Sequence, residues 1–194
     1  MMGLFVLGII SLKEMNGQNK VIWTIGHSTR SLEEFIGILH SFQIKLLADI
    51  RSYPGSKRFP HFNKTNLELS LPKEGINYIH LVNLGGRRKQ GPNSINTAWQ
   101  HTAFRGYTDY METANFQTAI PELESEALRQ RTAYMCSEAV WWRCHRSLVS
   151  DYLKFQGWEV IHIMGKSNGV EHPYTKASRI VDGRLTYSEN DLFS

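Results

Sequence analysis

Short apolar runs alternate with amphipathic segments along most of the chain. The runs are rich in β-branched and aromatic residues, and each is short enough to be a strand. Between them, apolar residues recur at the three- and four-residue spacing of a helix that buries one face. The predicted strands are 21–25, 44–50, 77–82, 132–135 and 158–164, and the predicted helices are 32–39, 65–73, 116–127 and 145–156.

The order of these elements predicts the class of fold. Strand–helix–strand units usually pair their strands in parallel, with a right-handed crossover through the helix, and we expect this of the unit 21–50. The chain as a whole predicts an α/β domain with a mainly parallel open sheet of about five strands, flanked by helices on both faces. Residues 179–187 predict a C-terminal β-hairpin on an Asp182-Gly183 turn.

Several residues mark where the predicted elements begin and end. Ser31 and Glu34 form a capping box at the start of the first helix. Gly75 and Gly157 suit the positions just after helices. Pro121 must lie in the first turn of its helix or kink it, because proline lacks the backbone donor that a helix interior needs.

Two segments carry no clear pattern. Residues 51–63 form a long loop in which basic residues are interleaved with aromatic ones. Residues 84–108 contain several glycines and no obvious element. Unpatterned segments of that length in a compact domain often carry function.

The start of the chain differs from the rest. Residues 1–10 are apolar but too short to span a bilayer, and they lack the basic start and cleavage site of a signal peptide. We interpret 1–20 as an extension that is disordered or results from an early start assignment, with Met15 as the true start. Residues 21–194 are then a single α/β domain, and no membrane association is expected.

Composition and charge add few constraints. The chain has 194 residues, a net charge of +4 and a pI of about 9.1, which favours anionic partners without identifying them. Its two cysteines do not make the disulfide framework of a small secreted domain. We therefore expect reduced thiols and a cytoplasmic protein.

Polar and reactive residues follow four of the predicted strands. Because the carboxyl ends of parallel strands lie at one edge of a sheet, these residues are expected to share a site there. The strand ends carry Gly26-His27-Ser28, Asp49-Ile50-Arg51-Ser52, Leu84-Gly85-Gly86-Arg87-Arg88 and Cys136-Ser137-Glu138.

These strand ends also resemble a known family. The chain is similar to the DUF488 family from about Ile22 to about Ile163, through five motifs in the same order. The motifs are Thr24-Ile-Gly-His-Ser28, Asp49-Ile-Arg-Ser52 with Pro54 and Ser56, Leu84-Gly-Gly-Arg87, Met135-Cys-Ser-Glu138 and Cys144-His-Arg146. The resemblance implies an α/β domain and a shared site, but no activity. The apolar extension before Val21 departs from the family pattern.

Cys136 is the first candidate nucleophile. It follows a strand and precedes a helix, with Arg143, His145 and Arg146 close by in the sequence to stabilise a thiolate. The alternative is a small buried side chain at a strand end. A cysteine phosphatase loop is disfavoured, because the segment 136–143 is one residue too long and lacks the glycines that cradle a phosphate.

Three further residues are candidates for catalysis. Glu138 and Asp49 could act as general acid or base, or could form ion pairs that hold Arg51 and Arg146 in place. His27 could contact a ligand or only cap the turn after its strand.

A second group of residues predicts an anion site. Gly85 and Gly86 would let the backbone approach a phosphate or carboxylate that Arg87 binds. The other candidates for substrate or anion binding are Arg51, Ser52, Arg143, His145 and Arg146. Aromatic residues among the cations of 51–64 are suited to stacking on a nucleic-acid base.

These residues support three hypotheses about the function of the protein. The first is an enzyme that acts on a phosphate-bearing substrate, a nucleotide or nucleic acid, at the carboxyl edge of the sheet. The second is a nucleic-acid-binding module without catalysis. The third is a metal-binding or thiol-redox protein that uses Cys136, Cys144 and His145, although their spacing is not that of a structural zinc site. The sequence identifies no cofactor, reaction or oligomeric state.

Overall fold

The computed structural model describes residues 20–189, which form one sheet with helices on both faces and a separate hairpin. The predicted extension 1–20 lies outside the described residues, apart from Lys20. The strands are β1 Val21–Gly26, β2 Leu46–Asp49, β3 Asn77–His80, β4 Thr132–Cys136, β5 Glu159–Gly165, β6 Asn168–Glu171, β7 Arg179–Val181 and β8 Arg184–Thr186. The α-helices are α1 Leu32–Ser41, α2 Lys64–Ser70, α3 Thr102–Met111, α4 Ala114–Arg129 and α5 Arg146–Phe155.

The sheet has six strands in the order β3-β2-β4-β1-β5-β6. The first five strands of that order run parallel, and β6 pairs antiparallel with β5 at the edge. An α/β fold with a mainly parallel sheet is confirmed, and so is the C-terminal hairpin of β7 and β8. Its turn residues Asp182 and Gly183 both have positive φ, as a two-residue turn matched to strand twist requires.

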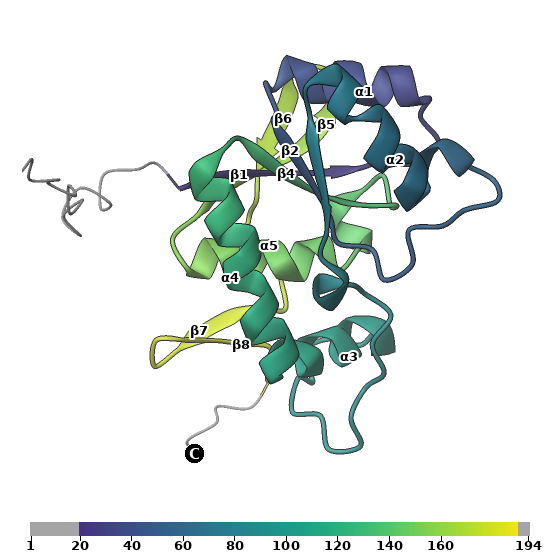
Figure 1. Ribbon diagram of the computed structural model, residues 1–194. Helices are drawn as coiled ribbons and strands as arrows, with labels where there is room; N and C mark the ends of the chain where they lie inside the picture. Colours follow the sequence, from purple (N-terminus) through teal and green to yellow (C-terminus); the bar gives the residue numbers. More distant parts are fainter. Residues whose placement is uncertain (1–19, 190–194) are drawn as a thin grey trace, which may run out of the picture.

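Helices cover the sheet on two sides. Figure 1 shows α1 and α2 on one face and α3, α4 and α5 on the other, with the hairpin beside α4. Two hydrophobic clusters match these two layers. One cluster joins α1 and α2 to the sheet through residues such as Phe35 and Leu67, and the other joins α3, α4 and α5 through residues such as Tyr107, Phe116 and Leu148.

The predicted pairing of the first two strands was wrong. β1 and β2 run parallel, but β4 lies between them and pairs with both. A strand far along the chain inserts there because its apolar side chains on both faces suit a central position: all of β4 is buried. The sequence pattern also missed β6 and α3. No helix within residues 20–189 is both long enough and apolar enough to cross a bilayer.

Pro121 lies in the interior of α4, not in its first turn. Its ring removes one helical hydrogen bond and crowds the preceding turn. We predict that Pro121→Ala raises the free energy of unfolding by about 2 kcal/mol, because alanine restores that bond, less a small gain in unfolded-state freedom. Urea denaturation measures this. The matched control is Glu122→Ala at the exposed neighbouring position, which should change stability by under about 0.5 kcal/mol. A destabilised Pro121→Ala variant would contradict the argument.

Candidate functional site

The site lies where the carboxyl ends of β1 and β4 meet. The connection after β1 passes through α1 on one face of the sheet, and the connection after β4 passes through α5 on the other. Such a divergence opens a crevice at the sheet edge. The two exits run side by side, because His27 N donates to Cys136 O at 3.0 Å and Ser28 N donates to Ser137 O at 2.9 Å. A cleft of about 660 Å³ opens at this point.

Most of the predicted site residues line this cleft. Those that line it are His27, Arg51, Ser52, Gly86, Arg87, Cys136, Glu138, Arg143 and His145. Asp49, Gly85 and Arg146 do not line the cleft. Asp49 accepts from Arg51, Gly85 packs against Ser52, and Arg146 donates to the carbonyl of Glu138. Four strand ends therefore contribute to one site. The arrangement brings the two cysteines together, although they are eight positions apart in the sequence.

Cys136, Cys144 and His145 form the reactive cluster of the site. Cys136 Sγ lies 3.8 Å from His145 Nδ1, and Cys144 Sγ lies 3.6 Å from the same nitrogen. The ligand atoms of the three residues are all within 4.8 Å of one another. Both cysteines are free and buried, and Cys136 lines the cleft. Cys136 ends β4, while Cys144 and His145 directly precede α5, so the cluster is held between two regular elements.

The tautomer of His145 follows from its other hydrogen bond. His145 Nε2 lies 3.1 Å from the carbonyl oxygen of Ile50. A carbonyl can only accept, so Nε2 carries a proton. In the neutral ring, Nδ1 therefore presents its lone pair to the two sulfur atoms. The ring is also packed against Tyr107, with centroids 5.1 Å apart, which limits its rotation.

The two thiols differ in acidity. A hydrogen bond from Cys144 holds the pKa of the Cys136 thiol well below its usual value, and His145 and Arg146 add to the shift. Burial raises the pKa of the Cys144 thiol well above its usual value, and Cys136 adds to that shift. The pair therefore favours a Cys136 thiolate beside a protonated Cys144.

Arg146 places a positive charge directly behind the cluster. Its side chain is 1% exposed and donates to Thr24 Oγ1 at 3.1 Å and to the carbonyl of Glu138 at 2.7 Å. Within residues 20–189 it makes no ion pair with a carboxylate, and its Nε has no hydrogen-bond partner. A buried charge without a counter-ion is costly. A thiolate at Cys136 supplies a negative charge close to it.

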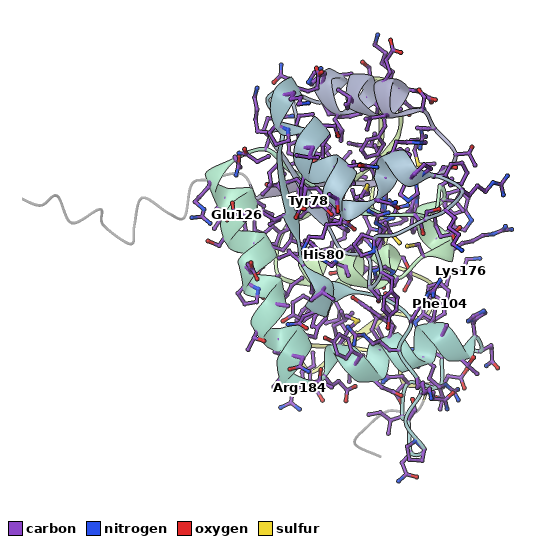
Figure 2. All side chains as sticks on the ribbon, turned by 45° about the vertical axis from the view of Figure 1, so that its right-hand side comes forward. Tyr78, His80, Phe104, Glu126, Lys176 and Arg184 are labelled. Atoms are coloured by element: carbon purple, nitrogen blue, oxygen red, sulfur yellow. The ribbon has the colours of Figure 1, made fainter. Side chains whose placement is uncertain are left out.

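Asp49, Arg51 and His27 form a buried network beside Cys136. Arg51 donates to both carboxylate oxygens of Asp49 and to His27 Nε2, while His27 Nδ1 donates to Ser28 O. Burial and Arg51 lower the pKa of His27 to about 4, so its ring is neutral. Tyr78 and His80, both labelled in Figure 2, reach this network from β3. Tyr78 donates to Asp49, and His80 donates to the carbonyl of Arg51.

This network bears on two predicted roles. Asp49 is fully buried, forms an ion pair with Arg51 and accepts a hydrogen bond from Tyr78, so it has the contacts of the predicted ion-pair role. Both ring nitrogens of His27 are engaged within the protein. Proton transfer by either residue stays a prediction, but their contacts fit them to hold Arg51 at the floor of the cleft.

The two glycines pack closely against the site. A Cβ on Gly86 would lie 2.8 Å from His145 Nδ1, and one on Gly85 would lie 2.5 Å from Ser52 Oγ. Ser52 in turn donates to the carbonyl of Gly86 at 2.6 Å. Close packing within the chain, against Ser52 and His145, therefore explains why both positions are glycine. Their predicted contact with an anion stays a prediction.

The rim of the cleft carries exposed charged side chains and an exposed aromatic ring. Arg87, Glu138 and Arg143 are exposed there. Tyr53 is 75% exposed, and the guanidinium of Arg87 lies 6.0 Å from its ring centroid. A large ring held so far into solvent is available to stack on a ligand.

The sequence pattern missed one wall of the cleft. His101, Phe104 and Tyr107 line it from α3 and its N-cap, and Tyr107 Oη donates to Leu84 O at 2.7 Å. Figure 2 labels Phe104 on this helix. The sequence does contain a helical pattern here, because Phe104, Tyr107 and Met111 lie at positions i, i+3 and i+7. Pro92 and the glycines upstream of α3 obscured it.

Comparison with known proteins adds one match. A family model described as "Domain of unknown function DUF488" matches residues 31–153, which is more than half of the chain. No curated protein and no solved structure matches the chain.

Proposed function

This chain belongs to the DUF488 family, whose name describes no activity, so we propose a function from the site itself. The protein is an enzyme that acts on a phosphate-bearing substrate, a nucleotide or nucleic acid, with Cys136 as the nucleophile. His145 is the general acid and base. Arg51, Arg87 and Arg143 bind the anionic groups of the substrate.

One observation carries this proposal: the thiol of Cys136 faces an imidazole nitrogen whose lone pair is free to take its proton. Nδ1 of His145 is 3.8 Å from Cys136 Sγ, and Nε2 is held by the Ile50 carbonyl at 3.1 Å. A nucleophile, a base and a group that orients the base make up the arrangement of covalent catalysis. The buried Arg146 favours the ion pair that proton transfer creates.

The proposed chemistry is a double displacement. Cys136 gives its proton to His145 Nδ1, and the thiolate attacks an electrophilic atom of the substrate. A bond from sulfur to that atom forms, the bond to the leaving group breaks, and the leaving group takes the proton from His145. Water then attacks the same atom, His145 accepts a proton from the water, and the sulfur leaves as thiolate.

The walls of the cleft support the substrate class. Arg87 and Arg143 line its rim, and one guanidinium can bind two phosphate oxygens at once. Arg51 lines its floor, where it is already paired with Asp49 and adds a contact through the edge that faces the cleft. Tyr53, on the loop after β2, and Phe104, on α3, both line the cleft. Cations beside aromatic rings suit a nucleotide, whose phosphate and base need both.

The test measures the reactivity of Cys136 in the folded, chelator-treated protein. Iodoacetamide near neutral pH, read by peptide mass spectrometry, should modify Cys136 at least about 10-fold faster than in His145→Asn, which removes the base. His40→Gln, on the exposed end of α1, is the control and should react like wild type. Nucleotides and single-stranded oligonucleotides are then screened for turnover, which Cys136→Ser should abolish.

Two results would count against the proposal. If Cys136 reacts only after the protein unfolds, Cys136 is a packing residue and not a nucleophile. If single strands bind with strong salt dependence but neither turnover nor a Cys136 adduct appears, the protein is a binding module.

A further inference from the structure

We propose that Cys136, Cys144 and His145 bind one Zn²⁺ ion, with a fourth coordination position open to the cleft. The proposal shares Cys136 with the proposed function but does not depend on it. A sulfur atom bound to zinc is not free to attack a substrate. Zinc binding would therefore switch off the nucleophile, and the two states of Cys136 exclude each other.

The distances within the cluster fit a tetrahedral zinc ion. Zinc binds thiolate sulfur at about 2.3 Å and imidazole nitrogen at about 2.0 to 2.1 Å, so tetrahedral angles place a sulfur and a nitrogen ligand about 3.5 Å apart. The observed separations from His145 Nδ1 are 3.6 Å to Cys144 Sγ and 3.8 Å to Cys136 Sγ. All three ligand atoms lie within 4.8 Å of one another. The two sulfur-to-nitrogen separations therefore need to change by only a few tenths of an ångström.

The hydrogen bonds around the cluster also suit a metal ligand. A metal-bound histidine nearly always donates its other ring N–H to a carbonyl or carboxylate. His145 does this, because its Nε2 lies 3.1 Å from the Ile50 carbonyl and its Nδ1 lone pair points at the sulfur atoms. Two sulfur ligands and one imidazole favour zinc over magnesium or calcium, which prefer oxygen.

The cleft provides the fourth position. Cys136, Cys144 and His145 all line it, and so does Gly86, where a Cβ would lie only 2.8 Å from Nδ1. The neighbour of the ligating nitrogen therefore has no side chain to cover the ion. Three protein ligands and one open position are typical of zinc sites that exchange water or bind small ligands.

The charges predict what fills that position. Zinc displaces the proton of Cys144 to solvent, so two thiolates neutralise the ion. The guanidinium of Arg146 remains, buried and without a carboxylate partner within residues 20–189. A fourth ligand with one negative charge, a hydroxide or a phosphate oxygen, brings the total to zero.

The experiment uses the full chain, reduced and stripped of metal. Zinc chloride is titrated in competition with a chromophoric chelator, and Co²⁺ is bound in parallel. We expect one ion per chain and, with Co²⁺, the sulfur-to-metal absorption of a thiolate site. Cys144→Ser and His145→Asn should each weaken binding about 100-fold or more, since loss of a ligand exceeds the 10- to 100-fold effect of losing its hydrogen-bond partner. His40→Gln should bind like wild type.

Alkylation separates this proposal from the proposed function. Zinc at one equivalent should slow the reaction of iodoacetamide with Cys136, and chelator should restore it. If zinc does not bind, or binds equally well to Cys144→Ser, the metal site is overturned, whatever the reactivity of Cys136. If zinc binds as expected while the stripped protein has an inert Cys136, the metal site stands and the nucleophile is overturned. If Cys144→Ser fails to fold, the Co²⁺ absorption of the wild type provides an independent readout.

Discussion

Gly26→Ala is expected to lower the free energy of unfolding by about 3 kcal/mol and to disrupt the site. A Cβ at this position would lie 1.7 Å from the carbonyl oxygen of Glu138 and 2.6 Å from its carbonyl carbon. Both are backbone atoms, so the strain cannot be relieved by a side-chain rotation. Either β1 or the loop after Cys136 must move.

Gly26→Ala should also disturb the site, because the Glu138 carbonyl is a hydrogen-bond acceptor for the buried Arg146. That carbonyl accepts from Arg146 at 2.7 Å, and the new methyl group would also lie 2.9 Å from the Arg146 guanidinium. Moving the loop therefore leaves a buried guanidinium with fewer acceptors. Cys136 should consequently lose its fast reaction with iodoacetamide as well.

Gly37→Ala is the matched control for Gly26→Ala. Gly37 lies inside α1, and a Cβ there meets nothing within 4 Å. The same substitution should stabilise the protein by about 0.5 to 1 kcal/mol, because alanine is the better helix former. Urea denaturation measures both variants. Equal stability changes in the two would contradict the contact at Gly26.

Acid should destabilise the protein by about 2 kcal/mol at pH 5 relative to pH 8 through His162 alone. His162 is fully buried on β5, stacked on Trp141 at 4.2 Å, with Nε2 2.8 Å from His172 Nδ1. Burial lowers its pKa to about 2, and His172 and Arg146 add to the shift. In the unfolded chain the pKa of His162 is near 6.5, so at pH 5 His162 is protonated in the unfolded state but not in the folded state.

The sign of this effect is fixed by the lowered pKa. The contribution of His162 to stability is complete above about pH 6.5 and falls as the pH drops toward 2, at up to about 1.4 kcal/mol per pH unit. Urea midpoints measured from pH 8 to pH 5 test it. His162→Gln should be less stable at pH 8 but should lose less stability on acidification, whereas His40→Gln should follow wild type. An unchanged slope in His162→Gln would refute the assignment.

The elements of this fold could be read largely from local patterns. The apolar run Val21–Gly26, the N-cap at Ser31 and the Asp182-Gly183 turn formed as predicted. Of the predicted capping box, Ser31 accepts from Glu34 N at 3.1 Å, while the Glu34 carboxylate pairs with Arg30. Each depends on residues within one turn or one strand. The helix α3 was missed although its apolar spacing is regular, because the preceding loop gave no start signal.

The candidate site was predicted in its location rather than in its contacts. Parallel strands must end at one edge, so His27, Arg51 and Cys136 could be placed together from the sequence. The hydrogen-bond and ion-pair partners of the site residues could not be predicted in this way. Nothing in the sequence pairs His145 with the Ile50 carbonyl, or predicts that Arg146 finds no carboxylate among residues 20–189.

The sequence by itself determined the strands other than β6, most of the helices, and the edge of the sheet at which reactive residues gather, because hydrophobic period and turn chemistry are local properties. Only the tertiary structure decided that β4 inserts between β1 and β2, and that insertion decides the site. It sets the end of β4 against the end of β1 and the start of α5 behind both, so that Cys136, Cys144 and His145 meet. Such long-range pairings are chosen by how complete faces bury against each other, which no single segment of the chain encodes.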